Sequence, residues 1–377
     1  MKKKGIRIFV ITIISLAIIV LISNIIMSLI KQNKTGKIIV WAKNENYKYI
    51  QDVAEAYMEN IKGVKITVNK YDDEDYNDLE NVSKLNNCPD IVCLDSEELN
   101  DLINKDIELK NVDSLISKNS SYFSERMIQE VTSEEDNKAI PFTTNPIVMY
   151  LRQDMLKEYG YDCDDIKTWN DFINMGKDIY NKSAGKIKIL NCVGEDYNSL
   201  ISLLVMQAME ENDNEFVIKE YVDNMLNQLE ENNILNKDEN SQYFAKISSV
   251  DGCYEIKQIE NQCIWTANNP PSYIIGGNRF YLKEGTYLSI ISHDNSDNET
   301  VNDFISYLIN NKKIIKKHAF NKTFYSSFNA YISSNTESNV NNFKDKSPYL
   351  VMSNIAIKAP SVSDFNLYIR IKNEYIS

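Results

Sequence analysis

The functional groups of this 377-residue chain favour the binding of polar molecules over catalysis. There are only two histidines, His293 and His318, so a histidine-based triad or a zinc site has almost nothing to work with. The acidic run at 72–75 lacks the spaced ligands and the glycine turn of a calcium loop, and a solvated helix start explains it better. An extracellular hydrolase with paired carboxylates stays open as a minor alternative, although no pair has supporting context. We predict no catalytic residue, no metal and no cofactor.

Polar residues that follow two predicted strands are the first candidate ligand contacts. Open α/β sheets bind ligands outside the carboxyl ends of their strands, and carboxylates and amides offer two hydrogen bonds in a fixed plane. The two groups are Lys43, Asn44, Glu45 and Asn46 after the strand at 38–42, and Asp95, Ser96 and Glu97 after the strand at 91–94. An ordinary structural role is the competing interpretation for each of these residues.

The elements that position these residues alternate between strand and helix. The run at 38–42 is apolar throughout, as in a strand that is covered on both faces. Apolar residues then recur at helical spacing over 50–61, Gly63 suits a helix C-cap, and 64–68 alternates as a second strand. A polar helix over 75–85 and the short apolar strand at 91–94 follow. This order predicts a doubly wound α/β start with a parallel sheet.

The remainder of the chain predicts further helices over 199–210, 216–231 and 301–309, and strands over 262–266 and 286–292. A chain of 377 residues is too long for one ordinary core and suits two lobes. The balance of 41 basic and 54 acidic residues gives a net charge of −13, which disfavours nucleic acid as a partner. The six cysteines are even in number, so disulfides are possible, but most of them are predicted to be small core residues.

The N-terminus predicts a membrane anchor. Three lysines at 2–4 and Arg7 precede the uncharged run at 8–30, which is about 23 residues long and can span a bilayer as a helix. The basic cluster favours a cytoplasmic N-terminus with the rest outside the cell, although lysines at 31, 34 and 37 weaken that argument. A cleaved signal peptide is the alternative, but 23–28 offers no small-residue cleavage site. We favour an uncleaved single-pass anchor in the cell membrane, with the soluble part extracellular.

Motifs over 140–172 form the most specific pattern in the chain. An apolar strand after Pro141 leads through Tyr-Leu-Arg-Gln-Asp at 150–154 into a short helix that ends at Gly160. Thr168 then opens another helix as an N-cap, with Asp171 as its acidic capping partner in Thr-Trp-Asn-Asp-Phe. This order resembles the lobe crossover of type 1 extracellular solute-binding proteins of ABC importers. Blocks at 38–68, 89–109 and 286–308 are similar to the same family, and the order fits most of 37–330.

The resemblance implies an α/β, two-lobe periplasmic-binding-protein-like (type II) fold with a hinged cleft, preceded by the N-terminal transmembrane helix. Residues 1–36 would form the anchor and linker, 37–144 with 286–330 lobe one, and 145–285 with 331–377 lobe two. Segments near 140–146 and 282–289 would bend so that the lobes close around a small solute and present it to an ABC permease. Family frequency and the 23 tyrosines favour a carbohydrate. The resemblance further implies a binding protein rather than an enzyme, acting as a monomer.

The same resemblance implies ligand contacts in the second half of the chain. They are Asn145 on the crossover strand, Glu195 and Tyr197 near a loop aromatic of the family, Trp265 or Tyr273 as a stacking surface, and Phe365 and Tyr368 as late aromatics. Ordinary packing is an equal alternative for Tyr197 and Tyr273.

Some features depart from the family pattern. No tryptophan follows Pro271, and Leu94 stands where some sugar binders carry an aromatic residue. The first cysteine, Cys88, comes too late for lipid attachment after the apolar segment, and the chain stops soon after Tyr375 without the family's final helices. These departures leave open a second function, that of a membrane-anchored sensor or accessory binding protein that has lost transport.

Overall fold

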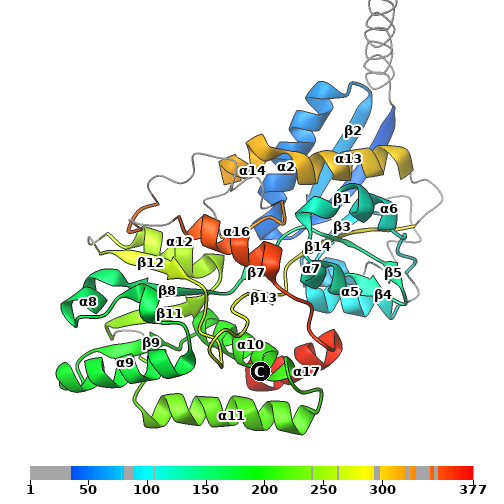
Figure 1. Ribbon diagram of the computed structural model, residues 1–377. Helices are drawn as coiled ribbons and strands as arrows, with labels where there is room; N and C mark the ends of the chain where they lie inside the picture. Colours follow the sequence, from blue (N-terminus) through cyan, green and yellow to red (C-terminus); the bar gives the residue numbers. More distant parts are fainter. Residues whose placement is uncertain are drawn as a thin grey trace, which may run out of the picture. The chain divides into compact units, whose positions relative to one another are not determined.

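The computed structural model of the chain describes residues 35–77, 79, 88–105, 107–238, 241–260, 263–292, 298–318, 322–327, 340–343 and 347–376. These residues divide into two compact units, whose elements are labelled in Figure 1. The first unit holds the described residues of Met1–Val92 and Ile291–Leu308, and the second those of Cys93–Ile290 and Ile309–Ser377. The predicted anchor at 8–30 and His293 lie outside the described residues. No helix within the described ranges is long and apolar enough to cross a membrane.

A parallel sheet forms the centre of the first unit. Strand β1 (Gly36–Ala42) pairs with β2 (Val64–Lys70) along its whole length. Strand β3 (Ile91–Leu94) pairs in parallel with β1 as well, and the boundary between the units falls inside it. Helix α2 (Asn44–Asn60) connects β1 to β2, and α3 (Asp73–Asn77) follows β2. The predicted strand–helix–strand start is therefore confirmed, whereas most of the helix predicted over 75–85 lies outside the described residues.

Helix α2 packs against α13 (Asn298–Asn310) through two buried tyrosines. The ring of Tyr57 meets Phe304 edge-on, with 5.4 Å between ring centroids, and the Tyr49 hydroxyl donates to the carbonyl of Leu308 at 2.7 Å. The apolar stripe of the 50–61 segment thus faces the interior, which explains why its residues recur at helical spacing.

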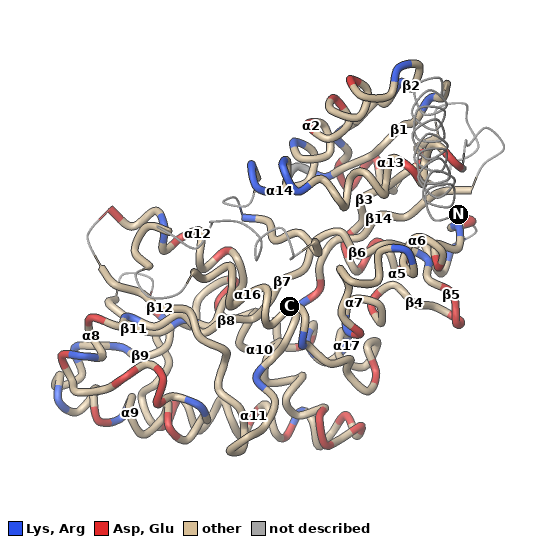
Figure 2. The backbone as a smooth tube through the Cα atoms, turned by 45° about the horizontal axis from the view of Figure 1, so that its top comes forward, with Lys and Arg blue, Asp and Glu red and all other residues tan. Residues whose placement is uncertain are grey.

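The second unit is built on a five-stranded mixed sheet in the order β10-β9-β11-β8-β12. Its strands are β8 (Val148–Arg152), β9 (Lys188–Asn191), β10 (Leu235–Asn236), β11 (Tyr243–Ser248) and β12 (Trp265–Asn268). The helices around it are α8 (Gln153–Glu158), η2 (Cys163–Asp165), α9 (Trp169–Lys182), α10 (Glu195–Met209), α11 (Glu215–Glu231) and α12 (Val250–Gln258). Figure 2 shows acidic and basic residues interspersed along α8 and α9, as expected of helices with one solvated face.

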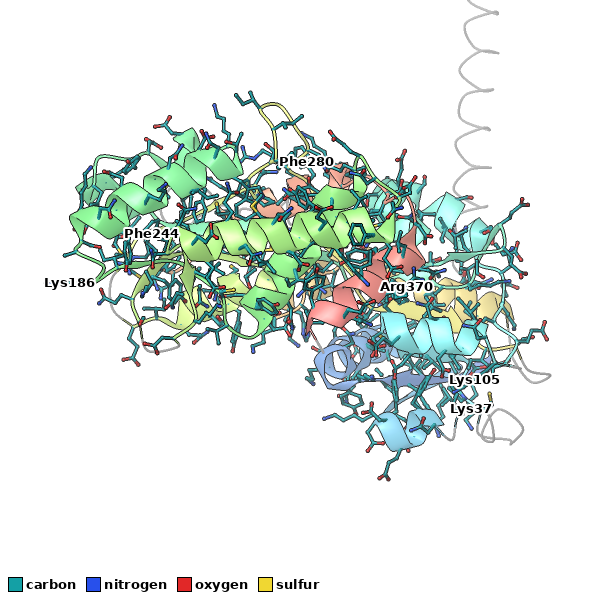
Figure 3. All side chains as sticks on the ribbon, turned by 90° about the horizontal axis from the view of Figure 1, so that it is seen from below. Lys37, Lys105, Lys186, Phe244, Phe280 and Arg370 are labelled. Atoms are coloured by element: carbon teal, nitrogen blue, oxygen red, sulfur yellow. The ribbon has the colours of Figure 1, made fainter. Side chains whose placement is uncertain are left out.

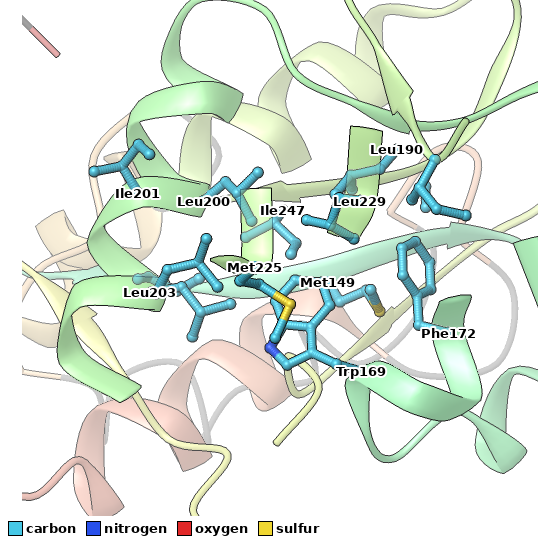
Figure 4. Packing of buried hydrophobic residues seen from close by; sticks show 14 of the residues in the cluster. Met149, Trp169, Phe172, Leu190, Leu200, Ile201, Leu203, Met225, Leu229 and Ile247 are labelled. Carbon is cyan, nitrogen blue, oxygen red and sulfur yellow. The ribbon is translucent and has the colours of Figure 1, made fainter. Parts of the chain in front are cut away.

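The core of the second unit is anchored by the start of α9. The Thr168 hydroxyl accepts from the Asp171 backbone at 3.2 Å while the Asp171 carboxylate accepts from the Thr168 backbone at 2.8 Å, so the predicted N-cap is confirmed. This capping box directs Trp169 inward, where it is 2 % exposed and its indole donates to Gln207 at 2.8 Å. Figure 4 shows Trp169 and Phe172 packed among the leucine, isoleucine and methionine side chains of the sheet and of α10 and α11.

Two short antiparallel strand pairs bring the segments near 140–146 and 282–290 together. Strand β6 (Ile140–Pro141) pairs with β14 (Tyr287–Ile290), and β7 (Asn145–Pro146) pairs with β13 (Leu282–Lys283). Between the pairs, a Cβ atom on Gly285 would lie 1.9 Å from the carbonyl oxygen of Thr143, so only glycine fits there. The hydroxyls of Thr143 and Thr286 lie 2.8 Å apart. The segments predicted as hinges, near 140–146 and 282–289, therefore run side by side, and we call them the crossing segments.

The second unit also contains several shorter elements and two C-terminal helices. They are α5 (Ser96–Ile103), α6 (Asp113–Lys118), η1 (Ser120–Tyr122), α7 (Glu125–Gln129), β4 (Thr132–Ser133), β5 (Asp136–Asn137), α14 (Lys312–His318), α16 (Pro348–Lys358) and α17 (Phe365–Ile376). All six cysteines of the chain are buried and none is in a disulfide, which confirms the prediction that most of them are core residues.

Candidate functional site

Four strands of the second unit's sheet end at the same edge. Strands β10 and β11 both run parallel to β9, and Asn236 at the end of β10 pairs with Asn191 at the end of β9. Strands β11 and β12 share one direction because both are antiparallel to β8, where Ile247 and Asn268 pair with Met149. Helices α10 and α12 begin directly after β9 and β11. We call this side of the sheet the carboxyl edge, and it is the edge at which open α/β sheets bind ligands.

A buried ion pair lies at the carboxyl edge. Lys246 on β11 has a side chain that is 1 % exposed, and its Nζ lies 3.1 Å from Oδ2 of Asp196 in the first turn of α10. Asp196 also accepts from Asn191 at 2.6 Å, and Lys246 donates to Glu255 at 2.5 Å. The pair therefore fastens the start of α10 to the sheet.

Burial and the ion pair shift the pKa values of Lys246 and Asp196 in opposite directions. Burial works to lower the pKa of Lys246, but the negative charges of Asp196 and Glu255 outweigh it, and the pKa is raised. Burial raises the pKa of Asp196, against the pull of Lys246 and of the hydrogen bond from Asn191. The ammonium of Lys246 is thus held as a cation inside the protein by its carboxylate neighbours.

A second set of charges lies on the solvent side of the same edge. Lys283 on β13 donates to Oε2 of Glu195 at 3.1 Å and to the Ser199 hydroxyl at 3.3 Å. The side chain of Glu195 is 58 % exposed, whereas that of Lys283 is 12 % exposed. In the first turn of α12, burial raises the pKa of Asp251, while Lys283 lowers it and Glu195 raises it. These three charged groups therefore act on one another at the start of α10 and α12.

This arrangement suits the binding of a polar solute. The Glu195 carboxylate offers acceptors and the Lys283 ammonium offers donors, both at positions fixed by backbone elements. Within the ranges that the structure describes, no three His, Cys, Asp or Glu side chains are grouped so that they could hold a metal ion.

The structure places Tyr197 and Asn145 close to this edge. Tyr197 lies in the first turns of α10, two residues after Glu195, and lines a pocket of about 490 Å³ together with Gly194 and Lys237. Asn145 lies on β7, directly before β8, and its side-chain amide donates to the carbonyl of Glu284 at 2.5 Å. Its amide nitrogen thus fastens one crossing segment to the other.

Trp265 and Tyr273 lie away from Glu195. Trp265 begins β12 beside Arg152, at the end of the sheet opposite the carboxyl edge, and is 2 % exposed. Tyr273 packs against Tyr221, with 5.2 Å between ring centroids, beside the last turn of α10. Glu195 is the first residue of that 15-residue helix, which spans about 22 Å. The sheet thus brings neither ring to the charges at the start of α10.

The partly buried ring of Phe365 and the buried ring of Tyr368 pack against Arg126. The guanidinium carbon of Arg126 lies 4.6 Å from the ring centroid of Phe365 and 5.1 Å from that of Tyr368. Arg126 and Tyr368 are both fully buried. These two rings therefore seat α17 on α7 through cation–π contacts.

The residues after β3 have local structural roles. Asp95 is the N-cap of α5, since its carboxylate accepts from the Glu98 backbone at 3.0 Å and the Glu98 carboxylate accepts from the Asp95 backbone at 2.9 Å. Ser96 is buried, and Glu97 is exposed with its Oε1 at 3.5 Å from the Asn373 side-chain amide. An ordinary structural role was the competing interpretation for these positions, and for Asp95 that role is the N-cap of α5.

The residues after β1 belong to the first unit. Lys43 directly precedes α2, and its Nζ lies 3.7 Å from the Asp73 carboxylate and 5.8 Å from the ring centroid of Tyr71. Asn46 is buried at 2 % exposure. The side chains of Asn44 and Glu45 lie outside what the structure describes.

Four charged residues of the carboxyl edge were not predicted from the sequence. They are Asp196, Lys246, Asp251 and Lys283. Lys246 had a usable signal, because a lysine within the otherwise apolar run at 244–247 must find a partner when that strand is buried. No sequence signal pointed to Lys283, because its position beside Glu195 depends on the pairing of the crossing segments.

Comparison with known proteins gives the following relatives. The family model for bacterial extracellular solute-binding protein matches residues 41–252, more than half of the chain. The structure is similar to the uncharacterized protein lmo0859 from Listeria monocytogenes EGD-e, with a TM-score of 0.66 and 16 % identity over 90 % of this chain and 92 % of that chain. It is similar to the sugar-binding protein MalE from Xanthomonas citri, with a TM-score of 0.67 and 12 % identity over 90 % and 96 % of the two chains. Maltose-bound MalE3 from T. maritima gives a TM-score of 0.63 and 14 % identity over 90 % and 92 %. No curated protein matches the sequence.

Proposed function

The chain belongs to the bacterial extracellular solute-binding proteins, and on this premise we propose that it is a cell-surface receptor that delivers a small solute to an ABC importer. The observation that carries the proposal is the carboxyl edge of the second unit. There the ends of β9, β10, β11 and β12 meet the first turns of α10 and α12, and the polar groups gather at that edge. The uncharged run at 8–30 would hold the receptor to the membrane as a single-pass anchor, with the binding part outside.

We propose a carbohydrate as the solute. A sugar presents several hydroxyls that both donate and accept, and Glu195, Lys283 and Asp251 supply acceptors and donors within one small region. Tyr197, two residues after Glu195 on α10, supplies an aromatic ring in the neighbouring pocket that it lines with Lys237. The structural relatives named MalE and MalE3 are described as sugar-binding and maltose-bound, which supports the choice of solute class. Of the residues predicted from the sequence, we therefore propose Asn145, Glu195 and Tyr197 as the ligand contacts.

We propose that binding is coupled to bending at the crossing segments. Gly285 lies between the β6–β14 and β7–β13 pairs, and the Thr143 and Thr286 hydroxyls bond to each other beside it. Backbone changes at a few such residues would let two predicted lobes close on the solute. The solute shifts this equilibrium only by the difference between its affinities for the closed and the open form.

The test is thermal unfolding of the full chain, in a mild detergent, against mono- and oligosaccharides, amino acids, polyamines and anions. A ligand that binds only the folded state at a hundredfold excess over its Kd adds about 2.7 kcal/mol of stability. Glu195→Gln and Lys283→Met should lose the shift. Glu158→Gln is the matched control, because this exposed carboxylate on α8 follows β8 at the opposite end of the sheet.

Each outcome decides between functions. A shift with oligosaccharides alone supports a sugar receptor, and a shift with another class keeps the receptor but rejects the carbohydrate. Equal losses in the Glu195 and Glu158 variants would reject the carboxyl edge as the site. No shift with any compound would favour a sensor or accessory protein that has lost transport.

A further inference from the structure

A tip of three large apolar residues stands exposed on the second unit. Tyr273, Ile274 and Ile275 are 56 %, 54 % and 93 % exposed. Phe216 and Val217 at the start of α11 are 75 % and 37 % exposed. Val217 lies one helical turn before Tyr221, whose ring packs against Tyr273, whereas Phe216 lines a separate pocket with Leu367 and Arg370. The three consecutive exposed residues at 273–275 mark an interaction surface, because leaving such side chains in water is unfavourable. We call these three residues and Tyr221 the apolar tip.

The loop that carries the apolar tip is held in one conformation. The guanidinium of Arg279 donates to the carbonyls of Pro270 at 2.8 Å, Asn269 at 2.7 Å and Ile166 at 3.2 Å. The Ser272 hydroxyl lies 2.7 Å from the Ile274 carbonyl, and the turn closes through Gly276 at a φ of +79°. The loop next to the labelled Phe280 projects from the surface of the second unit in Figure 3. The loop is therefore ordered before any partner arrives, which reduces the entropy cost of binding.

A small pocket opens beside the tip. It has a volume of about 200 Å³ and is lined by the rings of Tyr221 and Tyr273 and by Glu210 and Glu211 in the turn after α10. Burial raises the pKa of Tyr221, and the neighbouring Tyr273, Glu210 and Glu211, which line the same pocket, raise it further. The buried Tyr221 hydroxyl has no hydrogen-bond partner among the described residues. Two aromatic rings with two carboxylates form a site for a cation.

We propose that the apolar tip and this pocket form a docking surface for a protein partner that presents a basic side chain among apolar side chains. The basic side chain enters the pocket beside the packed rings of Tyr221 and Tyr273 and meets Glu210 and Glu211 there. Apolar side chains of the partner cover Ile274 and Ile275. The turn at 210–215 carries four acidic residues, which would repel an anionic lipid surface. A symmetric contact with a second copy would set the same acidic turns against each other. The proposal does not depend on which solute the carboxyl edge binds.

The test uses methyl NMR of the isoleucine-labelled full chain, titrated with a capped Leu-Arg-Leu peptide. A capped Leu-citrulline-Leu peptide is the matched probe, because citrulline has nearly the shape of arginine without its charge. Saturable shifts at Ile274 and Ile275 are expected with the arginine peptide, and about tenfold weaker binding with the citrulline peptide. Glu211→Gln and Ile275→Ser, both at exposed positions that tolerate substitution, should abolish the effect.

The control variant is Ile357→Ser, since Ile357 on α16 is also a large exposed apolar residue, at 43 %. It should bind the arginine peptide like the wild type. Equal binding of the two peptides, or shifts that persist in both tip variants, would overturn the proposal. Broadening of the tip signals by phosphatidylglycerol vesicles would assign the tip to a membrane instead. Concentration-dependent tip shifts without peptide would assign it to a second copy.

Discussion

Replacement of Glu130 by glutamine should change how the stability of the second unit depends on pH. The Glu130 side chain, directly after α7, is 3 % exposed and lies 3.6 Å from Nη2 of Arg126. Its other oxygen accepts from the Tyr287 hydroxyl at 2.8 Å. Burial raises the pKa of Glu130 from 4.5 to about 7, although Arg126 and Tyr287 lower it, and Glu284 adds to the rise. A carboxyl group with this pKa holds a proton in the folded state that it releases in the unfolded state.

The size and sign of the effect follow from that difference. Because the folded pKa is the higher one, the contribution to stability is complete below about pH 4.5 and is lost as the pH rises through about 7. Each tenfold change in proton affinity corresponds to about 1.4 kcal/mol, so the full loss is about 3 kcal/mol. A glutamine at this position keeps an oxygen for Tyr287 and carries no titrating proton, so the variant lacks this loss.

The assay is urea unfolding of the wild type and of Glu130→Gln from about pH 4.5 to about pH 8, followed by circular dichroism. The free energy of unfolding of the variant should rise relative to the wild type by about 3 kcal/mol over that range. Glu125→Gln, at an exposed carboxylate on the same helix, should leave the wild-type pH slope in place. Parallel curves for the wild type and Glu130→Gln would refute the reasoning, because the burial of Glu130 would then have no energetic consequence.

Three further substitutions test the fold and the site. Gly285→Ala should cost about 3 kcal/mol, since its Cβ would overlap the Thr143 carbonyl oxygen at 1.9 Å, and thermal unfolding measures the loss. Lys246→Met should cost about 3–5 kcal/mol in urea unfolding because it leaves Asp196 buried without its cation, and adding Asp196→Asn should recover part of that loss. Thr168→Ala should cost about 1 kcal/mol by removing the N-cap of α9, and faster amide exchange in the first turn of that helix would report it.

The parts of the fold that depend on local spacing were predictable. The apolar run of β1 and the helical stripe of α2 lie close together in the sequence, and both fold as their patterns predict. The N-cap of α9 was equally predictable, since Thr168 and Asp171 meet within one helical turn. The lobe-crossover motif at 140–172 added the long-range part, because that run marks a whole family whose model matches the chain.

The candidate site depends on long-range pairing that no local pattern contains. Lys246 meets Asp196 only because β11 lies beside β9, and the two residues are 50 positions apart. The sequence likewise does not show that Asp95 uses its carboxylate to cap α5, since a ligand contact and an N-cap favour the same residue type. Trp265 illustrates a third limit, because its place at the amino end of β12 becomes visible only with the strand register.

Two neighbouring acidic residues on α10, Glu195 and Asp196, have different roles at the carboxyl edge, one in solute binding and the other in stability. Successive helical residues point about 100° apart, so Asp196 faces the sheet while Glu195 faces away from it. Asp196 is 4 % exposed and is fixed by Lys246 and Asn191. Glu195 is 58 % exposed and shares Lys283 with Ser199, so a solute hydroxyl can compete for either group. Glu195→Gln should therefore weaken solute binding at unchanged stability, whereas Lys246→Met should reduce both. If Glu195→Gln unfolds as easily as Lys246→Met, the two carboxylates do not have separate roles.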